Sequence, residues 1–332
     1  MNSPLSLTVQ TGLATKTIAA SSLAAVNVDT TVQDKAVAFP TDARLLNKAR
    51  IALVKLGAKC GIKLRQPYTF IGQKAFVQSA RYAHARQFNR AKAQTKKLRV
   101  VLGRVIRDIQ RKSGQLQLPA KEQTRLAKLL QIAQRIHSQQ RVRAEGEPPK
   151  IYSVHAPEVE CIAKGKAHKQ YEFGVKVGLV TTSKESFVLA AASLAGNPYD
   201  GHTLKQCLDQ AKRCSGVAAS QVFVDKGYKG HGCTTDACKV FISGAKRAIT
   251  PAIQKLLERR SAIEPVIGHM KSDSRLARNF LQGTNGDAVD ALLCACAHNL
   301  RKILNKLRLF CAPMAIRLCD LLAMLRLQQV GA

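Results

Sequence analysis

The chain has 332 residues, 46% of them hydrophobic, so it can bury a sizeable core as one large or two smaller domains. Lys and Arg total 53 against 21 acids, and the formal charge of +32 excludes an acidic surface and indicates a polyanionic partner such as nucleic acid. No apolar run has the length of a membrane span and no signal-peptide pattern begins the chain, so we expect a cytoplasmic protein, associated with the nucleoid.

The ten cysteines are scattered singly, without a C-x-x-C pair, which is typical of reduced thiols in a cytosolic compartment. His231, Cys233 and Cys238 could form part of a zinc site, but a clear fourth ligand is missing. Buried or surface thiols are therefore the simpler interpretation.

The N-terminal segment combines a weakly patterned stretch with a first strand. Residues 1–23 are small and polar without a strong period, and we interpret them as a loose lead-in. The apolar stretch AAVNVDTTV (24–32) predicts a strand that ends on a carboxylate, Asp29.

From about residue 41 to 146 the pattern is helical and basic. Thr41 and Asp42 can cap a first helix. Within 81–112, apolar or small residues recur by alternate threes and fours, which predicts a coiled-coil seam. This seam consists of Phe88, Ala91, Thr95, Leu98, Leu102, Val105 and Ile109. Gly114 and Pro119 then break the chain before a second helix, so a helical hairpin is predicted.

The hairpin is strongly basic on its exposed faces. A solvated charged face is the ordinary explanation, but such faces mix both signs, and here cations stand against the single acid Asp108. We therefore favour contact with a phosphate backbone, with Arg90, Lys96 and Lys97 among the contacting residues.

Pro148-Pro149 marks a boundary, after which the period becomes strand-like. Strands are predicted at 152–155, 170–182 and 186–196, with the last two forming a hairpin. Asp200 follows Asn197-Pro198 and is interpreted as the cap of a helix. A further strand runs to Asp225, a short one covers 239–243, and a helix follows from about Thr250.

Two segments carry the most informative spacing. The run Val222-Phe223-Val224 stops at Asp225 and is followed at once by a glycine-bearing turn that contains Lys226 and Lys229. Further on, Arg260, Glu264 and Lys271 are spaced by four and seven residues, so they fall on nearly one face of a helix. Pro265 directly after Glu264 predicts that this helix kinks or restarts there.

Three acids at the edges of regular elements, Asp29, Asp225 and Glu264, are the arrangement that a divalent-metal site requires. Each also has an ordinary interpretation. Asp29 can finish an edge strand, Asp225 can initiate a turn, and Glu264 can form a surface i,i+4 pair with Arg260.

These residues carry a resemblance. Arg260-x3-Glu264-x6-Lys271 resembles the signature around the catalytic glutamate of bacterial insertion-sequence transposases of the Asp-Asp-Glu type. VFVDKGYKGH resembles the second-aspartate block of that family, and VNVDTTVQ resembles the first. The resemblance is closest to the IS five group and extends from about residue 5 to about 310. One departure is Leu257, where the family often has a tyrosine.

The resemblance implies an α/β fold of the ribonuclease H-like type, a mixed sheet with flanking helices interrupted after its first strand by a basic helical insertion. The implied domains are a lead-in and first catalytic strand (1–35), the basic helical insertion (36–148), the remainder of the catalytic domain (149–311) and a C-terminal helix (312–332). The family also has an N-terminal DNA-binding domain, for which Asp29 comes too early, so we expect an N-terminally truncated copy.

The implied activity is Mg²⁺-dependent phosphodiester hydrolysis and strand transfer, with Mn²⁺ able to substitute. Asp29, Asp225 and Glu264 would be the metal ligands and catalytic residues. The phosphate-contacting residues would be Arg260, Lys271, Lys226, Lys229, Arg90, Lys96 and Lys97. The expected partners are DNA, both element ends and target, and further copies of the chain in a dimer or larger synaptic complex. Neither a membrane nor a small-molecule substrate is expected.

Two other functions remain open from the sequence. A catalytically inactive DNA-binding fragment of a transposase would bind DNA in a salt-sensitive way without metal-dependent cleavage. A structural RNA-binding protein would prefer RNA to DNA and would not bring the three acids together.

Overall fold

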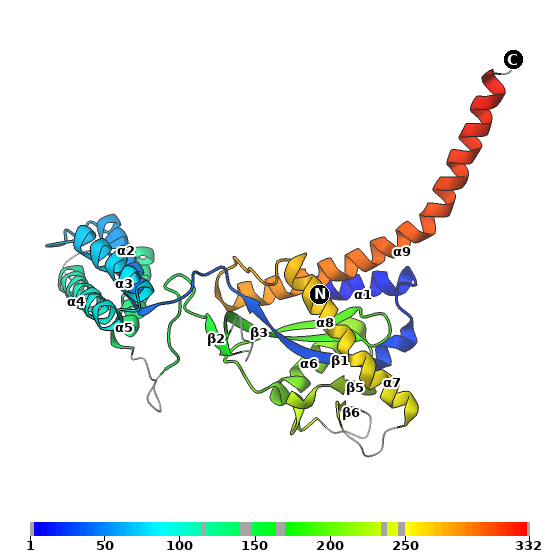
Figure 1. Cartoon of the computed structure of the whole chain (residues 1–332), viewed down its shortest axis with the longest axis horizontal. Helices are drawn as coiled ribbons and strands as arrows, with labels where there is room; N and C mark the ends of the chain where they lie inside the picture. The colour runs from blue at the N-terminus through cyan, green and yellow to red at the C-terminus, as the bar shows by residue number, and fades with distance from the viewer. Residues whose placement is uncertain are drawn as a thin grey trace. The chain divides into compact units, whose positions relative to one another are not determined.

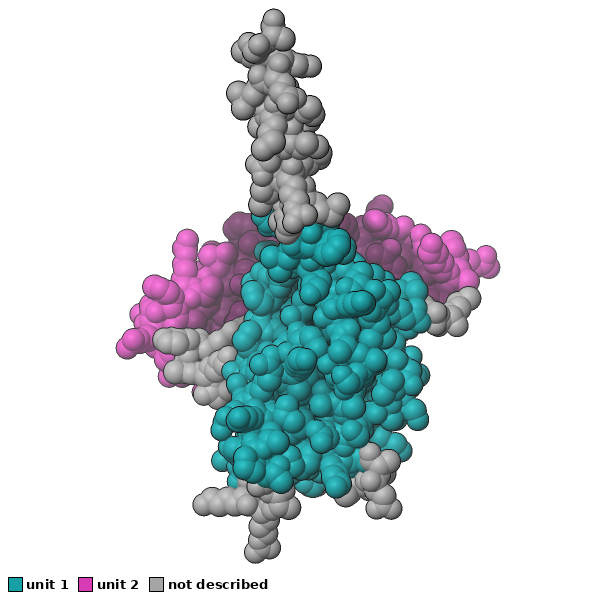
Figure 2. Space-filling view, turned by 90° about the vertical axis from the view of Figure 1, so that its right-hand side faces the viewer, with its two compact units in different colours: residues 1–36, 174–332 teal, residues 37–173 magenta. Residues whose placement is uncertain are grey.

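The computed structural model describes residues 3–114, 117–139, 148–163, 170–233, 238–244 and 250–330, with side chains up to residue 311. The chain divides into two compact units, which Figure 2 distinguishes by colour. Unit 1 comprises residues 1–36 and 174–332, and unit 2 comprises residues 37–173. The sequence of unit 2 therefore lies between two segments that fold together.

Unit 1 contains a mixed sheet in which β3, β1, β5 and β6 are neighbours in that order (Figure 1), and β4 pairs with β3. Its strands are β1 (Ala25–Asp34), β3 (Tyr171–Thr182), β4 (Val188–Leu194), β5 (Gln221–Val224) and β6 (Lys239–Ile242). β3 runs antiparallel to both β1 and β4, whereas β5 is parallel to β1, and β6 is parallel to β5. The sheet thus joins an antiparallel half to a parallel half at β1.

Helices flank the sheet of unit 1. They are α1 (Pro4–Ala14), α6 (Asp200–Ser215), α7 (Pro251–Arg259), α8 (Ile263–Ser272) and α9 (Gly283–Val330), with 3₁₀ turns η1 (Ala20–Ala24), η2 (Lys226–Tyr228) and η3 (Arg260–Ala262). On one face of the sheet, Val28 packs in a cluster with Leu204 of α6. On the other face, Leu179 packs in a cluster with Ile263 and Met270 of α8. Because successive strand residues point to opposite faces, β3 and β4 contribute residues to both clusters. The fold class is α/β, as predicted.

The part of unit 2 that the structure describes contains the helices α2 (Asp42–Lys59), α3 (Thr69–His84), α4 (Phe88–Ser113) and α5 (Ala120–Ser138), and the short strand β2 (Glu160–Ala163). The Thr41 hydroxyl accepts a hydrogen bond from the backbone N–H of Arg44, as the predicted cap of α2 requires. Leu53 of α2, Leu102 of α4 and Ile136 of α5 meet in one buried cluster. The predicted hairpin of α4 and α5 is therefore part of a larger helical core.

The continuous seam predicted over 81–112 is wrong at its N-terminal end. A turn at Arg86, with φ of +57°, separates α3 from α4. Phe88 is 67% exposed, whereas Leu98, Leu102 and Ile109 of the same seam are buried. Spacing alone could not show that the helix begins afresh at Phe88, because neither glycine nor proline marks the turn.

The loose lead-in predicted for residues 1–23 is also wrong. Ser3 caps α1 by accepting a hydrogen bond from the Ser6 N–H, and Pro4 occupies the first helical turn. Leu5 and Val9 are fully buried. The segment has few large apolar residues, so its helical period is weak in the sequence although its packing is complete.

The C-terminal segments differ from expectation in one respect. A separate C-terminal helix was expected over 312–332, but α9 continues through Pro313 to Val330 as one helix. A proline removes one backbone hydrogen bond without necessarily ending a helix whose other bonds remain. Within the described ranges, none of the helices combines the length and hydropathy needed to cross a membrane.

Candidate active site

Asp29 and Asp225 lie at the same level on neighbouring parallel strands. The last residues of β1 and β5 in register are Asn27 and Phe223, and each aspartate follows two residues later. Asp29 is paired with Leu179 of β3. The side chain of Leu179 packs in the cluster that contains α8, so it marks the α8 face of the sheet. Since side chains two residues apart share a face, both aspartates leave the sheet on the side of α8.

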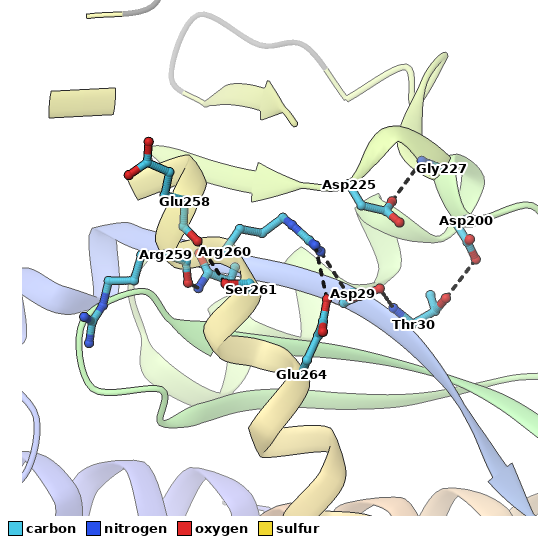
Figure 3. A network of polar contacts seen from close by, with 11 residues as sticks. Asp29, Thr30, Asp200, Asp225, Gly227, Glu258, Arg259, Arg260, Ser261 and Glu264 are labelled. Atoms are coloured by element: carbon cyan, nitrogen blue, oxygen red, sulfur yellow. Dashed lines mark hydrogen bonds and ion pairs between the residues drawn. The ribbon is translucent and has the colours of Figure 1, made fainter. Parts of the chain in front are cut away.

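Asp225 is oriented by the turn that follows it. Its Oδ1 accepts a hydrogen bond from the backbone N–H of Gly227 at 2.9 Å, and it caps η2. The turn-initiating role considered for Asp225 is therefore present, and it fixes the carboxylate at the end of β5 (Figure 3).

Asp29 is bound from two directions. The backbone N–H of Thr30 donates to its Oδ1 at 2.7 Å, and Arg260 Nη1 lies 3.3 Å from its Oδ2. The other terminal nitrogen of Arg260 lies 3.5 Å from Glu264 Oε1. Arg260 therefore bridges the first aspartate and the glutamate, as Figure 3 shows. The side chains of Arg260 and Asp29 are 14% and 18% exposed, whereas that of Glu264 is 65% exposed.

The local sequence explains how Arg260 and Glu264 are placed. Thr250 caps α7, which ends at Arg259, and the 3₁₀ turn η3 leads into α8. Pro265 lies in the first turn of α8, where its missing N–H costs no intrahelical hydrogen bond. The predicted restart is confirmed, and it begins at Ile263. Glu264 thereby falls in the first helical turn, where the helix dipole favours a negative charge.

Asp200 is a site residue that sequence reasoning missed. It was interpreted as a cap, but the cap position is Tyr199 and makes no side-chain hydrogen bond. Asp200 Oδ1 instead accepts from Thr30 Oγ1 at 3.0 Å and from Lys176 Nζ at 2.9 Å. These partners lie 170 and 24 residues away, so no local signal pointed to them.

Tyr228 lies beneath the same group of acids. It is fully buried, and among the described residues its hydroxyl has no hydrogen-bond partner. Burial is the main cause that raises its pKa, and Cys207, Asp29, Asp200 and Asp225 raise it further. The phenol therefore stays neutral, and it is close enough to Asp29, Asp200 and Asp225 for their negative charges to raise its pKa.

The predicted phosphate-contacting residues fall into two groups. In unit 1, Lys226 and Lys229 are exposed beside Asp225, and Lys271 follows Glu264 on α8. In unit 2, Arg90, Lys96 and Lys97 are exposed on α4. Arg90 Nη1 also donates to Gln87 Oε1, and its guanidinium lies over the Tyr82 ring.

The three acids have the chemistry of a divalent-metal site, although they do not form a finished one here. Within the described ranges no three His, Cys, Asp or Glu side chains are grouped so that they could hold a metal ion. Hard divalent cations take carboxylate oxygens, and Asp29 and Asp225 offer these from adjacent positions. Arg260 lies between Asp29 and Glu264. Its guanidinium provides there the positive charge that a metal ion would otherwise supply.

Comparison with known proteins locates a family within the chain. A protein of Rhizobium meliloti described as "Uncharacterized protein ORF8 in nfe locus" is 54% identical over 84 residues, which are 25% of this chain and 41% of that protein. The chain thus matches less than half of that relative's length. No solved structure matches. Residues 139–300, which include Asp200, Asp225, Arg260 and Glu264, match the family described as Transposase DDE domain, and this match supports a transposase of the DDE type.

Proposed function

We propose that the chain is an insertion-sequence transposase of the IS five group that cuts and joins DNA, with Asp29, Asp225 and Glu264 as its catalytic residues. The observation that carries this proposal is the convergence of two aspartates from neighbouring strands with the Arg260–Glu264 pair, since residues 29 and 260 are 231 positions apart. The family match adds independent support for the domain that holds the second aspartate and the glutamate.

The strand pattern supports a ribonuclease H-like assignment of the sheet. Three antiparallel strands (β1, β3 and β4) are followed by two strands that extend the other edge in parallel with β1. In this assignment unit 2 is a helical insertion after the first strand, and its sequence position between β1 and β3 is consistent with that.

The residues divide the chemical work between them. Asp29, Asp225 and Glu264 would hold divalent metal ions, Mg²⁺ by preference and Mn²⁺ as a substitute. When bound, the metal would neutralise the charge that develops on the phosphoryl group and favour attack by water or a 3′-hydroxyl. Arg260 presents a planar pair of donors. Once metal ions replace it as the cation beside Asp29 and Glu264, these donors would be available to bind a phosphate. The backbone N–H groups of Thr30 in β1 and Gly227 in η2 keep the two aspartates oriented before DNA arrives.

DNA is the partner that the charge of the protein supports best. The formal charge of +32 and the exposed cations of α4 would attract the phosphate backbone regardless of sequence. A synaptic complex would need at least two copies of the chain to hold two element ends.

The deciding experiment is DNA cleavage by Asp225→Asn compared with Asp209→Asn, an exposed acid on α6 as the matched control. Purified protein is incubated with DNA that carries the ends of its element, with Mg²⁺, with Mn²⁺ or with EDTA. We expect metal-dependent nicking or joining by the unaltered and Asp209→Asn proteins and none by Asp225→Asn, while all three retain DNA binding in gel shifts.

Two results would contradict the proposal. Equal cleavage by Asp225→Asn would remove this aspartate from the site. Salt-sensitive DNA binding by well-folded protein without any metal-dependent cleavage would favour an inactive DNA-binding protein instead.

A further inference from the structure

The α6 face of the sheet, opposite the proposed metal ligands, carries a second polar network. Thr30 immediately follows Asp29, so their side chains leave β1 on opposite faces. Lys176 of β3 is paired with Val32, which places it on the same face as Thr30. Asp200, in the first turn of α6, receives both of them on one carboxylate oxygen, Oδ1.

This network tethers a part of β1 that lacks a strand neighbour on one side. β5 is in register with β1 only from Ala25 to Asn27, so Asp29 and Thr30 lie beyond that ladder. The Thr30 hydroxyl bonds Asp200 at 3.0 Å, while the Thr30 amide bonds Asp29 at 2.7 Å. One residue therefore connects Asp200 to the first aspartate.

The other oxygen of Asp200 reaches the turn that orients the second aspartate. A methyl group placed on Gly227 would lie 3.3 Å from Asp200 Oδ2 and 3.0 Å from Asp225 Oδ1. Asp200 thus packs against the glycine whose N–H holds Asp225. A side chain there would crowd both carboxylates, and each would have to shift by a few tenths of an ångström.

The charge of Asp200 is already balanced, which argues for an orienting role over a metal-binding one. Lys176 Nζ donates to Asp200 Oδ1 and also to the carbonyl oxygen of Pro198 at 2.7 Å. The side chains of Lys176 and Asp200 are only 12% and 28% exposed, so this ion pair is largely shielded from water. A carboxylate whose Oδ1 already receives both Thr30 and Lys176 is better suited to orient its neighbours than to bind a metal ion.

We propose that Asp200 is a positioning residue that fixes Asp29 through Thr30 and Asp225 through Gly227, with Lys176 as its anchor. This inference rests on the proposed function of the two aspartates as metal ligands. Residues that orient metal ligands from behind contribute about 10–100-fold to metal affinity in other proteins, so the effect is measurable.

The test compares Asp200→Ala, Asp200→Asn and the exposed control Asp209→Ala in the full-length chain. Mn²⁺ binding is titrated by electron paramagnetic resonance, and exchange of the Thr30 and Gly227 amide hydrogens is followed by NMR without metal. Asp200→Ala is expected to weaken Mn²⁺ binding about tenfold and to accelerate exchange at both amides. Asp200→Asn keeps an acceptor for Thr30 and Lys176, so it is expected to retain most of the Mn²⁺ affinity and most of the slow exchange at the two amides.

A second pair of variants separates orientation from general loss of stability. Thr30→Val removes the hydroxyl at nearly constant shape and is expected to reproduce the Asp200→Ala effect on Mn²⁺ binding, whereas Thr30→Ser is not. Combining Thr30→Val with Asp200→Ala is expected to add little further loss, since both remove the same tether.

The outcomes distinguish this inference from the proposed function. Unchanged Mn²⁺ affinity and unchanged amide exchange in Asp200→Ala would overturn the positioning role. If the unaltered protein bound no Mn²⁺, the metal site itself would be refuted, and the exchange measurements would still decide whether Asp200 tethers the backbone at Thr30 and at Gly227.

Discussion

Arg260 Nη1 lies 3.3 Å from Asp29 Oδ2 although 231 residues separate them, and it is this ion pair that connects the start of α8 to β1. Both side chains are mostly shielded, at 14% and 18% exposure. Removing the guanidinium would leave a part-buried carboxylate without its cation, which is more costly than losing an exposed ion pair.

We therefore expect Arg260→Gln to lower the free energy of unfolding by about 1–3 kcal/mol in EDTA. Urea unfolding followed by circular dichroism would measure it. The free energy of unfolding of Arg260→Lys should fall between those of the unaltered protein and Arg260→Gln, because one ammonium cannot bridge Asp29 and Glu264 with the same pair of donors. Lys255→Gln, an exposed cation on α7, is the matched control, and an equal loss there would remove the special role of Arg260.

The packing of α1 gives a second prediction. Leu5 is fully buried and Leu7 is 51% exposed, although they are two residues apart on one helix. Leu5→Ala should reduce the free energy of unfolding by about 2–5 kcal/mol, whereas Leu7→Ala should change it by less than about 0.5 kcal/mol. Similar small effects in the two variants would show that the N-terminal segment is not part of the folded core.

DNA binding by α4 can be tested through its salt dependence. Each cation that neutralises a phosphate contributes about 0.9 to the slope of log affinity against log salt, so Lys96→Gln/Lys97→Gln should reduce that slope by about 2. Fluorescence anisotropy over a range of NaCl would measure it. Lys121→Gln/Lys128→Gln removes two exposed cations from α5 as a control of equal charge. An equal change in both double variants would indicate a diffuse field without specific contact at α4.

His298 makes the stability of unit 1 depend on pH. Burial is the main cause that lowers its pKa to about 4, and Lys302 and Arg301 lower it further, although the bond of Nε2 to the Ser186 carbonyl oxygen opposes this. The unfolded chain takes up this proton near pH 6.5, but the folded chain does not until about pH 4. The stabilisation is therefore complete above pH 6.5 and is lost progressively as the pH falls toward 4.

The depressed pKa of His298 corresponds to roughly 3 kcal/mol between pH 7 and pH 4. Urea midpoints recorded across this range should fall more steeply for the unaltered protein than for His298→Gln, which retains a donor for Ser186. Parallel curves for the two proteins would show that the histidine does not govern this dependence. His269→Gln, with an exposed side chain, serves as the control.

The sequence allowed Asp225 to be placed correctly because its signal is local: an apolar run stops there before a glycine turn, and β5 ends at Val224. The predicted strand end at Asp29 is wrong, because β1 continues to Asp34 and its later residues pair with β3. The equal level of the two aspartates on β1 and β5 depends on a register that no local pattern encodes. The metal-binding role of both remains a prediction.

Asp200 shows where local reasoning ends. An acid after Asn197-Pro198 at a helix start has the composition of a cap, and propensity favours that interpretation. Its partners, Thr30 and Lys176, belong to strands far away in the chain, and their hydroxyl and ammonium groups outcompete the local cap. Tertiary contacts decided its orientation, as they also decided that the sparse apolar residues of α1 would be buried.

The interruption of the sheet has a consequence for synthesis on the ribosome. β1 pairs with β3 from Val26–Thr182 to Asp34–Gly174, yet residues 35–170 must all emerge between the two strands. At about 5–20 residues per second, the nascent β1 waits on the order of ten seconds for its antiparallel neighbour. Until β3 emerges, the edge of β1 that pairs with it stays open, so this short apolar stretch is accessible to chaperones that shield such segments during translation.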